Sequence, residues 1–140
     1  MIENFKIFLV DDNIFCLNLY QQILRNLGFH DVRSFQNGAD CLQNLHDYPS
    51  VIFLDMDMDE LHGFEVLKKI KRFDPNINVV ILSGQEDMQT AVNAMKYGAF
   101  DYLIKGDEVE QKIEQVLDRI ATVESMLRKS KPSLLKRLML

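Results

Sequence analysis

The sequence has no tryptophan, only two cysteines and three prolines, and no long apolar run. Its apolar runs, such as residues 51–54 and 79–82, are four residues long, far short of the roughly 20 that a membrane-spanning helix needs. No membrane span is therefore expected. Cys16 and Cys41 lack CxxC or Cys/His spacing, which argues against a zinc or dithiol site and predicts buried free thiols. Residues 1–4 lack the basic flank and long apolar stretch of a signal peptide, so a cytoplasmic location is expected.

Charge is distributed unevenly along the chain. Five of the 16 basic residues follow Glu124, whereas all 21 acidic residues lie at or before it, which leaves a formal charge of −10 up to Glu124 and +5 after it. Nucleic acids are bound mainly through basic surfaces that neutralise their phosphates. The acidic main part of the chain therefore argues against direct nucleic-acid binding.

Hydrophobic periodicity predicts alternating strands and helices. Apolar runs of strand length cover residues 5–10, 51–54, 77–82 and 100–104, and a weaker, edge-like strand covers 31–35. Apolar spacing of three and four predicts helices over residues 14–27, 38–45, 63–73, 88–97 and 109–128. Strands that are apolar on both faces and joined by crossover helices form a parallel sheet covered on both sides. We therefore expect an α/β three-layer sandwich with a five-stranded parallel sheet and five helices.

The C-terminal part of the chain differs from the rest. We predict a domain over residues 4–122, and a helical extension with a basic and apolar tail over residues 123–140. Pro132 is expected to end the last helix because proline lacks an amide hydrogen. Apolar residues of that helix form a short heptad seam, which favours a homodimer or a connector to an output domain over a simple exposed end. The seam comprises Val109, Ile113, Val116, Ile120, Val123 and Leu127.

Polar residues follow four of the predicted strands. Asp11 and Asp12 follow the first strand, Asp55 the third, Ser83 the fourth and Lys105 the fifth. The carboxyl ends of parallel strands converge on one edge, where ligands bind. Three carboxylates held together need protonation or a cation, and all-oxygen ligands suit a hard divalent ion such as Mg²⁺ or Mn²⁺. A carboxylate beside such an ion can attack a phosphoryl group whose oxygens a lysine and a hydroxyl bind.

Four motifs in this order resemble the receiver domain of two-component response regulators. They are residues 8–13 (FLVDDN), Asp55 with Met58 and Gly63 after it, residues 81–83 (ILS) and residues 102–105 (YLIK). The resemblance covers residues 4 to about 120. It implies the flavodoxin-like receiver fold with strand order 2-1-3-4-5. It also implies a phosphorelay signalling role without enzymatic activity beyond self-catalysed phosphoryl transfer and hydrolysis.

The resemblance implies roles for the residues at the acidic edge. Asp55 would accept phosphate from a sensor histidine kinase or a phosphotransfer protein. Asp12 and Asp55 would bind Mg²⁺ directly, with the backbone carbonyl of Asp57 as a further protein ligand, and Asp11 would hold the ion through water. Lys105 would contact the phosphoryl group.

The resemblance also implies a conformational switch. Ser83 would move toward an attached phosphoryl group, and Tyr102 would rotate inward as it does so. Asp57, Asp59 and Gln85 are expected to modulate the reaction. The dianionic group would bias an existing equilibrium. It would thereby alter the surface of residues 88–97, 100–104 and the last helix, which is also a candidate homodimer surface.

Two residues depart from the family pattern. Asp59 and Gly106 stand where the family usually has proline, and glycine cannot enforce the cis turn that proline makes there. Asp57 and Asp59 add negative charge beside Asp55, which favours a metal ion and opposes an approaching phosphoryl group. Our hypothesis is tighter Mg²⁺ binding and an altered phosphoryl lifetime.

The acidic residues allow three other interpretations. A calcium loop starting at Asp55 would need glycine and glutamate where Glu60 and Val66 stand. Residues 51–57 (VIFLDMD) resemble the nucleophile strand of haloacid-dehalogenase-like phosphatases, but the acidic pair precedes the nucleophile, and little of the chain is left for a cap. An unphosphorylated receiver that only binds partners also fits Asp59 and Gly106.

Single residues have simpler structural interpretations as well. Either aspartate of the pair at 11 and 12 could cap the helix that follows. Taken alone, Tyr102 fits the core. Met88, Met95 and Tyr97 are expected to face packing surfaces.

Overall fold

The computed structural model describes residues 4–58 and 63–139, and residues 130–139 by their backbone alone. The strands are β1 (Ile7–Val10), β2 (Val32–Phe35), β3 (Val51–Asp55), β4 (Asn78–Ser83) and β5 (Asp101–Ile104). The helices are α1 (Ile14–Asn26), α2 (Gly38–Gln43), the short 3-10 helix η1 (Leu45–Asp47), α3 (Gly63–Phe73), α4 (Met88–Lys96) and α5 (Val109–Met139). The expected alternation of strands and helices is confirmed.

The five strands form one parallel sheet in the order β2-β1-β3-β4-β5. β1 lies between β2 and β3, with Ile7 opposite both Val32 and Val51. The chain therefore moves outward to one edge through β2 and then returns past β1 to the other side. Because the direction of winding reverses between β1 and β3, a crevice opens at the carboxyl ends of these strands.

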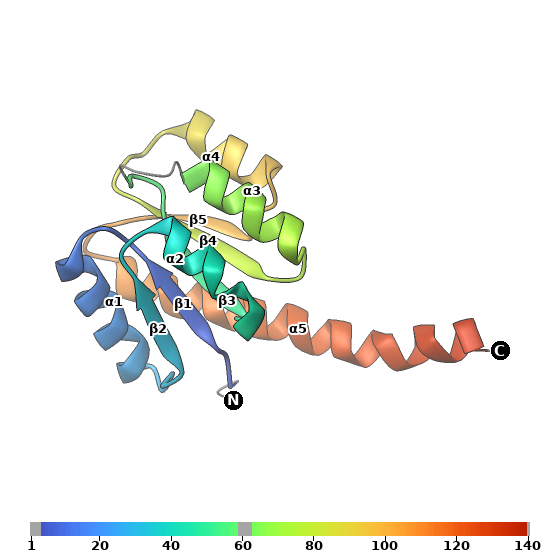
Figure 1. The fold of residues 1–140 in the computed structure, drawn as a ribbon. Helices are drawn as coiled ribbons and strands as arrows, with labels where there is room; N and C mark the ends of the chain where they lie inside the picture. The colour runs from blue at the N-terminus through green and yellow to red at the C-terminus, as the bar shows by residue number, and fades with distance from the viewer. Residues whose placement is uncertain (1–3, 59–62, 140) are drawn as a thin grey trace.

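Helices cover both faces of the sheet, as Figure 1 shows. Side chains alternate along each strand, so odd and even positions of β1 face opposite layers. Leu9 belongs to the cluster that packs on α1 and α5, and Phe8 belongs to the one that packs on α2, α3 and α4. The two clusters form the core, and the three-layer sandwich is confirmed.

The start of α1 is capped by asparagine. Asn13 has extended backbone angles, and its side-chain oxygen accepts hydrogen bonds from the amides of Phe15 and Cys16. The interpretation of Asp11 or Asp12 as the cap is therefore wrong. Both aspartates precede the residue whose side chain can reach the free amides of the first turn, and they remain available for chemistry.

The last helix is longer than the sequence predicted. α5 continues through Pro132 to Met139, so the expectation that this proline ends it is wrong. The φ angle that the proline ring imposes is compatible with a helix. Proline has no amide hydrogen, so one helical hydrogen bond is lost at this position. The outer part of α5 projects away from the sheet in Figure 1. At its base the side-chain amide of Asn78 donates to Glu124 at 3.0 Å. Within the described residues, no helix is both long and apolar enough to cross a bilayer.

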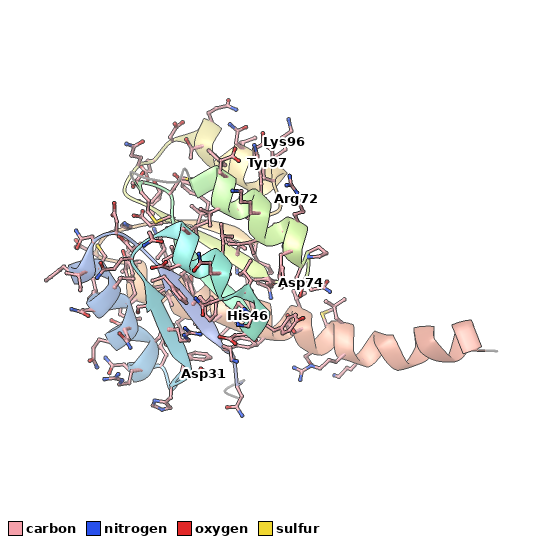
Figure 2. All side chains as sticks on the ribbon, in the orientation of Figure 1. Asp31, His46, Arg72, Asp74, Lys96 and Tyr97 are labelled. Atoms are coloured by element: carbon pink, nitrogen blue, oxygen red, sulfur yellow. The ribbon has the colours of Figure 1, made fainter. Side chains whose placement is uncertain are left out.

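Helix α4 presents an apolar surface to solvent. Met88, Val92 and Met95 are exposed, and so is Tyr97, labelled in Figure 2 at the end of this helix. The expectation that Met88 and Met95 face packing surfaces is therefore wrong, whereas Tyr97 packs on Phe64 of α3 with the ring centroids 5.8 Å apart. Ala94 is the one buried residue of this short helix. Its small side chain lets α4 pack closely on the sheet.

Candidate functional site

The predicted site residues come together at the carboxyl edge of the sheet. Asp11 directly follows β1, Asp55 and Ser83 end β3 and β4, and Lys105 follows β5. Asp11, Asp55 and Ser83 are all buried. The edge is held in register by backbone hydrogen bonds, including Lys105 N–H to the Ser83 carbonyl at 2.8 Å. Residues far apart in the sequence thus share one crevice, as the topology predicts.

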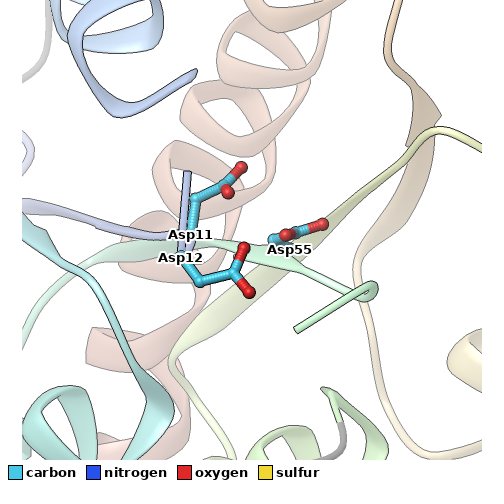
Figure 3. Close-up of side chains that lie close together, drawn as sticks. All are labelled: Asp11, Asp12 and Asp55. Atoms are coloured by element: carbon cyan, nitrogen blue, oxygen red, sulfur yellow. The ribbon is translucent and has the colours of Figure 1, made fainter. Parts of the chain in front are cut away.

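Three carboxylates form a compact acidic cluster. Oxygen atoms of Asp11, Asp12 and Asp55 lie within 4.8 Å of one another. Figure 3 shows these side chains side by side at the ends of their strands. Asp12 is exposed while the other two are buried. Hard divalent cations prefer such a set of oxygen donors, one of which faces solvent and leaves an entry path. The acidic cluster therefore fits a divalent metal ion.

The ammonium group of Lys105 joins two of these carboxylates. Its Nζ lies 3.1 Å from Asp11 Oδ2 and 3.1 Å from Asp55 Oδ1. Asp55 Oδ1 also accepts the amide hydrogen of Asp57 at 3.1 Å. The second oxygen of Asp55 takes no part in these bonds, so the Asp55 carboxylate is held on one side only.

Burial and charge act against each other at this site. Burial raises the pKa of Asp55 to about 6, and the amide of Asp57 and the charge of Lys105 limit that rise. Burial alone would lower the pKa of Lys105, but the neighbouring charges of Asp55 and Asp11 raise it overall. Lys105 is therefore a permanent cation, whereas Asp55 is ionised at neutral pH but less readily than an exposed aspartate.

Asp57 makes a contact that the sequence did not reveal. Its carboxylate is exposed and accepts the backbone amide hydrogen of Gly84 at 3.1 Å. The loop after β3 is thereby tied to the loop after β4. A sequence pattern carries no signal for this bond, because Gly84 takes part through its backbone.

The predicted switch residues both contact the loop that follows β4, since Ser83 ends β4 and Tyr102 lies in β5. The amide of Gln85 donates to Ser83 Oγ at 3.1 Å, and the Tyr102 hydroxyl donates to the Gln85 carbonyl at 3.0 Å. Tyr102 is half-buried and packs against the core cluster under α2, α3 and α4. Ser83 and Tyr102 are thus linked through Gln85.

Two further expectations concern the neighbouring loops. Asp59 lies outside the described residues. Residues 4–58 and 63–139 contain no cis peptide bond, so the Lys105–Gly106 bond is trans. Gly63, the first residue of α3, packs directly against Met56, because a Cβ atom at position 63 would lie 2.5 Å from the Met56 sulfur. This glycine therefore lets α3 pack beside the residue that follows Asp55.

Other notable residues are not members of the acidic cluster. His46 and Asp31, labelled in Figure 2, are near the opposite end of the sheet. Cys41 is buried and Cys16 half-buried, and both are free thiols. Burial raises the pKa of both thiols, to about 12 for Cys41, so neither is activated as a nucleophile.

Comparison with known proteins gives a consistent result. The family model of the response regulator receiver domain matches residues 7–118. The chain is 35% identical over 127 residues to the transcriptional regulatory protein ZraR of Klebsiella oxytoca. The aligned region covers 88% of this chain and 28% of ZraR. The chain thus spans less than a third of this relative. The family match does not support the phosphatase interpretation.

Solved structures share the fold. NtrX from Brucella abortus in complex with ATP superposes with a TM-score of 0.82 and 28% identity, covering 92% of this chain and 29% of NtrX. A response regulator receiver domain protein from Clostridium thermocellum gives a TM-score of 0.79 and 28% identity, covering 86% of this chain and 97% of that one. With its parallel sheet, its acidic cluster and the lysine facing it, the chain belongs to the response regulator receiver domain family.

Proposed function

We propose that this chain is a phosphorylated receiver domain in which Asp55 accepts a phosphoryl group. The observation that carries the proposal is Lys105 Nζ at 3.1 Å from both Asp11 and Asp55, beside a third carboxylate. A buried carboxylate with a cation on one side and a metal-binding cluster on the other is equipped to take up a phosphoryl group. Receiver domains are generally not enzymes, and we propose that this chain catalyses only its own phosphorylation and dephosphorylation.

The acidic cluster is proposed to hold Mg²⁺ or Mn²⁺. Asp12 and Asp55 would bind the ion directly with the backbone carbonyl of Asp57, and Asp11 would act through water. When bound, the ion neutralises negative charge on the phosphoryl oxygens and on the carboxylates. We retain the hypothesis that Asp57 and Asp59 strengthen metal binding.

The reaction is a transfer between two nucleophiles. An oxygen of Asp55 forms a bond to phosphorus as the phosphorus–nitrogen bond of a phosphohistidine on the kinase or phosphotransfer protein breaks, and the leaving imidazole takes up a proton. Lys105 moves part of its interaction from Asp55 to the new phosphoryl oxygens. That carboxylate must be ionised to attack. Burial raises the pKa of Asp55 to about 6 in the metal-free chain, so protonation opposes the transfer at low pH, and a bound cation would favour the ionised form.

The proposed response begins in the loop after β4. Ser83 gives up its bond from the Gln85 amide and donates its hydroxyl hydrogen to a phosphoryl oxygen. Tyr102, bonded to the Gln85 carbonyl, follows the loop inward. The surface of α4, β5 and α5 then changes, and its exposed apolar side chains suit a second copy or an output partner.

We also propose the wider setting of the domain. A receiver over residues 4–122 would act in the cytoplasm, and residues 123–140 would form a connector or a dimer helix. Val123 continues the seam of α5 beyond the sheet and is exposed, which supports a partner for this helix. Direct nucleic-acid binding by this segment is not proposed.

The proposal is tested by intact mass after incubation with Mg²⁺ and acetyl phosphate. We expect one labile phosphoryl adduct that disappears in Asp55→Ala and when a chelator removes the metal. Asp118→Asn, which alters an exposed carboxylate on α5, should form the adduct as the unaltered chain does.

Other outcomes separate the alternatives. A folded chain that forms no adduct under any condition would point to a receiver that acts only by binding partners. Rapid phosphate release from many unrelated monoesters would instead indicate a phosphatase, contrary to the proposal.

A further inference from the structure

The loop after β4 is held in its present position by a small number of hydrogen bonds from outside it. Gly84 N–H donates to the Asp57 carboxylate at 3.1 Å, and the Tyr102 hydroxyl donates to the Gln85 carbonyl at 3.0 Å. The Lys105 amide donates to the Ser83 carbonyl at 2.8 Å, within the ladder between β4 and β5. Of these three bonds, only the first connects the loop to the segment that follows β3.

Asp57 is placed to act on both loops. Its amide hydrogen bonds Asp55 Oδ1 at 3.1 Å, and its side chain bonds Gly84. One residue thus fixes the acceptor carboxylate with its backbone and the next loop with its carboxylate. A charged acceptor makes a stronger hydrogen bond than a neutral one, although exposure to water weakens it here.

We propose that Asp57 is a positioning residue whose carboxylate holds the β4–α4 loop in its unphosphorylated arrangement by occupying the amide of Gly84. The inference rests on the proposed function. Gly84 directly follows Ser83, so a movement of Ser83 toward Asp55 carries the Gly84 amide with it. The bond to Asp57 must then break, and the carboxylate and the phosphoryl oxygens compete for the same stretch of loop.

The competition has a modest expected size. An exposed single hydrogen bond typically shifts an equilibrium by about fivefold. Asp57→Ala removes the acceptor and should raise the apparent affinity for a phosphoryl mimic by about that factor. Asp57→Asn keeps a weaker, uncharged acceptor and should lie between Asp57→Ala and the unaltered chain.

Asp87→Asn is the matched control for charge. Asp87 lies in the same loop and caps α4 by accepting the amide of Gln89. Asparagine caps a helix about as well as aspartate does. This variant therefore removes one negative charge from the loop, preserves α4 and leaves the Gly84 bond intact.

The first part of the experiment uses the metal-free, unphosphorylated chain. The amide proton of Gly84 is followed by ¹⁵N–¹H correlation spectroscopy and by hydrogen exchange. We expect an upfield shift and about fivefold faster exchange in Asp57→Ala, and no change in Asp87→Asn. An unaltered Gly84 amide in Asp57→Ala would overturn the inference.

The second part measures the affinity of the same variants for beryllofluoride, a phosphoryl mimic, at saturating Mg²⁺. Mg²⁺ affinity is measured separately, so that loss of charge near the metal is not mistaken for release of the loop. Equal beryllofluoride affinities in Asp57→Ala and the unaltered chain would contradict the competition. If no variant binds beryllofluoride, the proposed function itself fails, a result that is recognisable because the Gly84 amide still reports the hydrogen bond.

Discussion

The acidic cluster and the outer face of α4 reverse the usual distribution of residues in opposite ways. Asp11 and Asp55 carry charge at only 2% exposure, whereas Met88 and Val92 are apolar and 82% and 54% exposed. Buried carboxylates raise the free energy of the folded state until a cation neutralises them. Exposed apolar side chains cost little in an isolated domain and gain free energy only when a partner covers them.

The two regions therefore differ in the kind of ligand that would stabilise them. Under the proposed function, small charged ligands would complete the acidic cluster and a macromolecule would cover the α4 face. The loop of Ser83, Gly84 and Gln85 runs from the first region to the second, since it leaves β4 at the acidic edge and leads into α4. A charge change at Asp55 therefore has a short physical path to the exposed apolar face.

The largest effect on stability is expected where the buried charges lose their cation. Lys105→Ala leaves Asp11 and Asp55 facing each other and should lower the free energy of unfolding of the metal-free chain by about 3 kcal/mol at pH 7.5. Urea denaturation measures the change, with the exposed Lys69→Ala as control. A loss no larger than that of the control would show that Lys105 does not stabilise the acidic cluster.

The next effect comes from removing the buried charge itself. The pKa of Asp55 is raised to about 6 in the folded chain, so its ionisation opposes folding at neutral pH. Asp55→Asn should therefore raise the free energy of unfolding of the metal-free chain by about 2 kcal/mol above pH 6. This advantage should shrink as the pH falls toward 4, where the folded chain keeps Asp55 protonated. An advantage independent of pH would contradict the assigned charge.

Metal binding should stabilise the chain to a smaller extent. At ten times its dissociation constant, Mg²⁺ should raise the free energy of unfolding by about 1.4 kcal/mol. The gain should be greatly reduced in Asp12→Asn, because that carboxylate completes the acidic cluster. Thermal unfolding with and without Mg²⁺ measures both chains, and equal gains would remove Asp12 from the proposed ligands.

Substitutions on the α4 face should have the smallest effect on stability. Met88→Gln should change the free energy of unfolding by less than about 0.5 kcal/mol, because the side chain is already exposed. Ala94→Leu on the same helix is the contrast, since overpacking a buried site costs about 1–3 kcal/mol. A large destabilisation by Met88→Gln would mean that this face is packed within the domain.

The sequence predicted the fold and most of the site because their signals are local. Short apolar runs mark the strands, and Asp11, Asp55, Ser83 and Lys105 stand where these runs end. Parallel topology then brings the strand ends together without any knowledge of side-chain geometry. The strand order itself came from the family resemblance.

The remaining features depend on tertiary contacts. The bond from Gly84 to Asp57 uses a backbone amide and leaves no pattern in the sequence. The exposure of Met88 follows from how α4 lies on the sheet, and periodicity cannot distinguish a face that meets the core from one left open for a partner. Only Asn13 carried an overlooked local signal, since asparagine directly before an apolar helix is a typical cap.

The central claim is that Asp55 itself, among several neighbouring aspartates, receives the phosphoryl group. Borohydride reduces an aspartyl phosphate to homoserine, so peptide mapping after treatment with acetyl phosphate, Mg²⁺ and borohydride locates the acceptor. We expect homoserine at position 55 alone and none in chelator-treated protein. Homoserine at position 57 or 59, or at none of the three, would contradict the assignment.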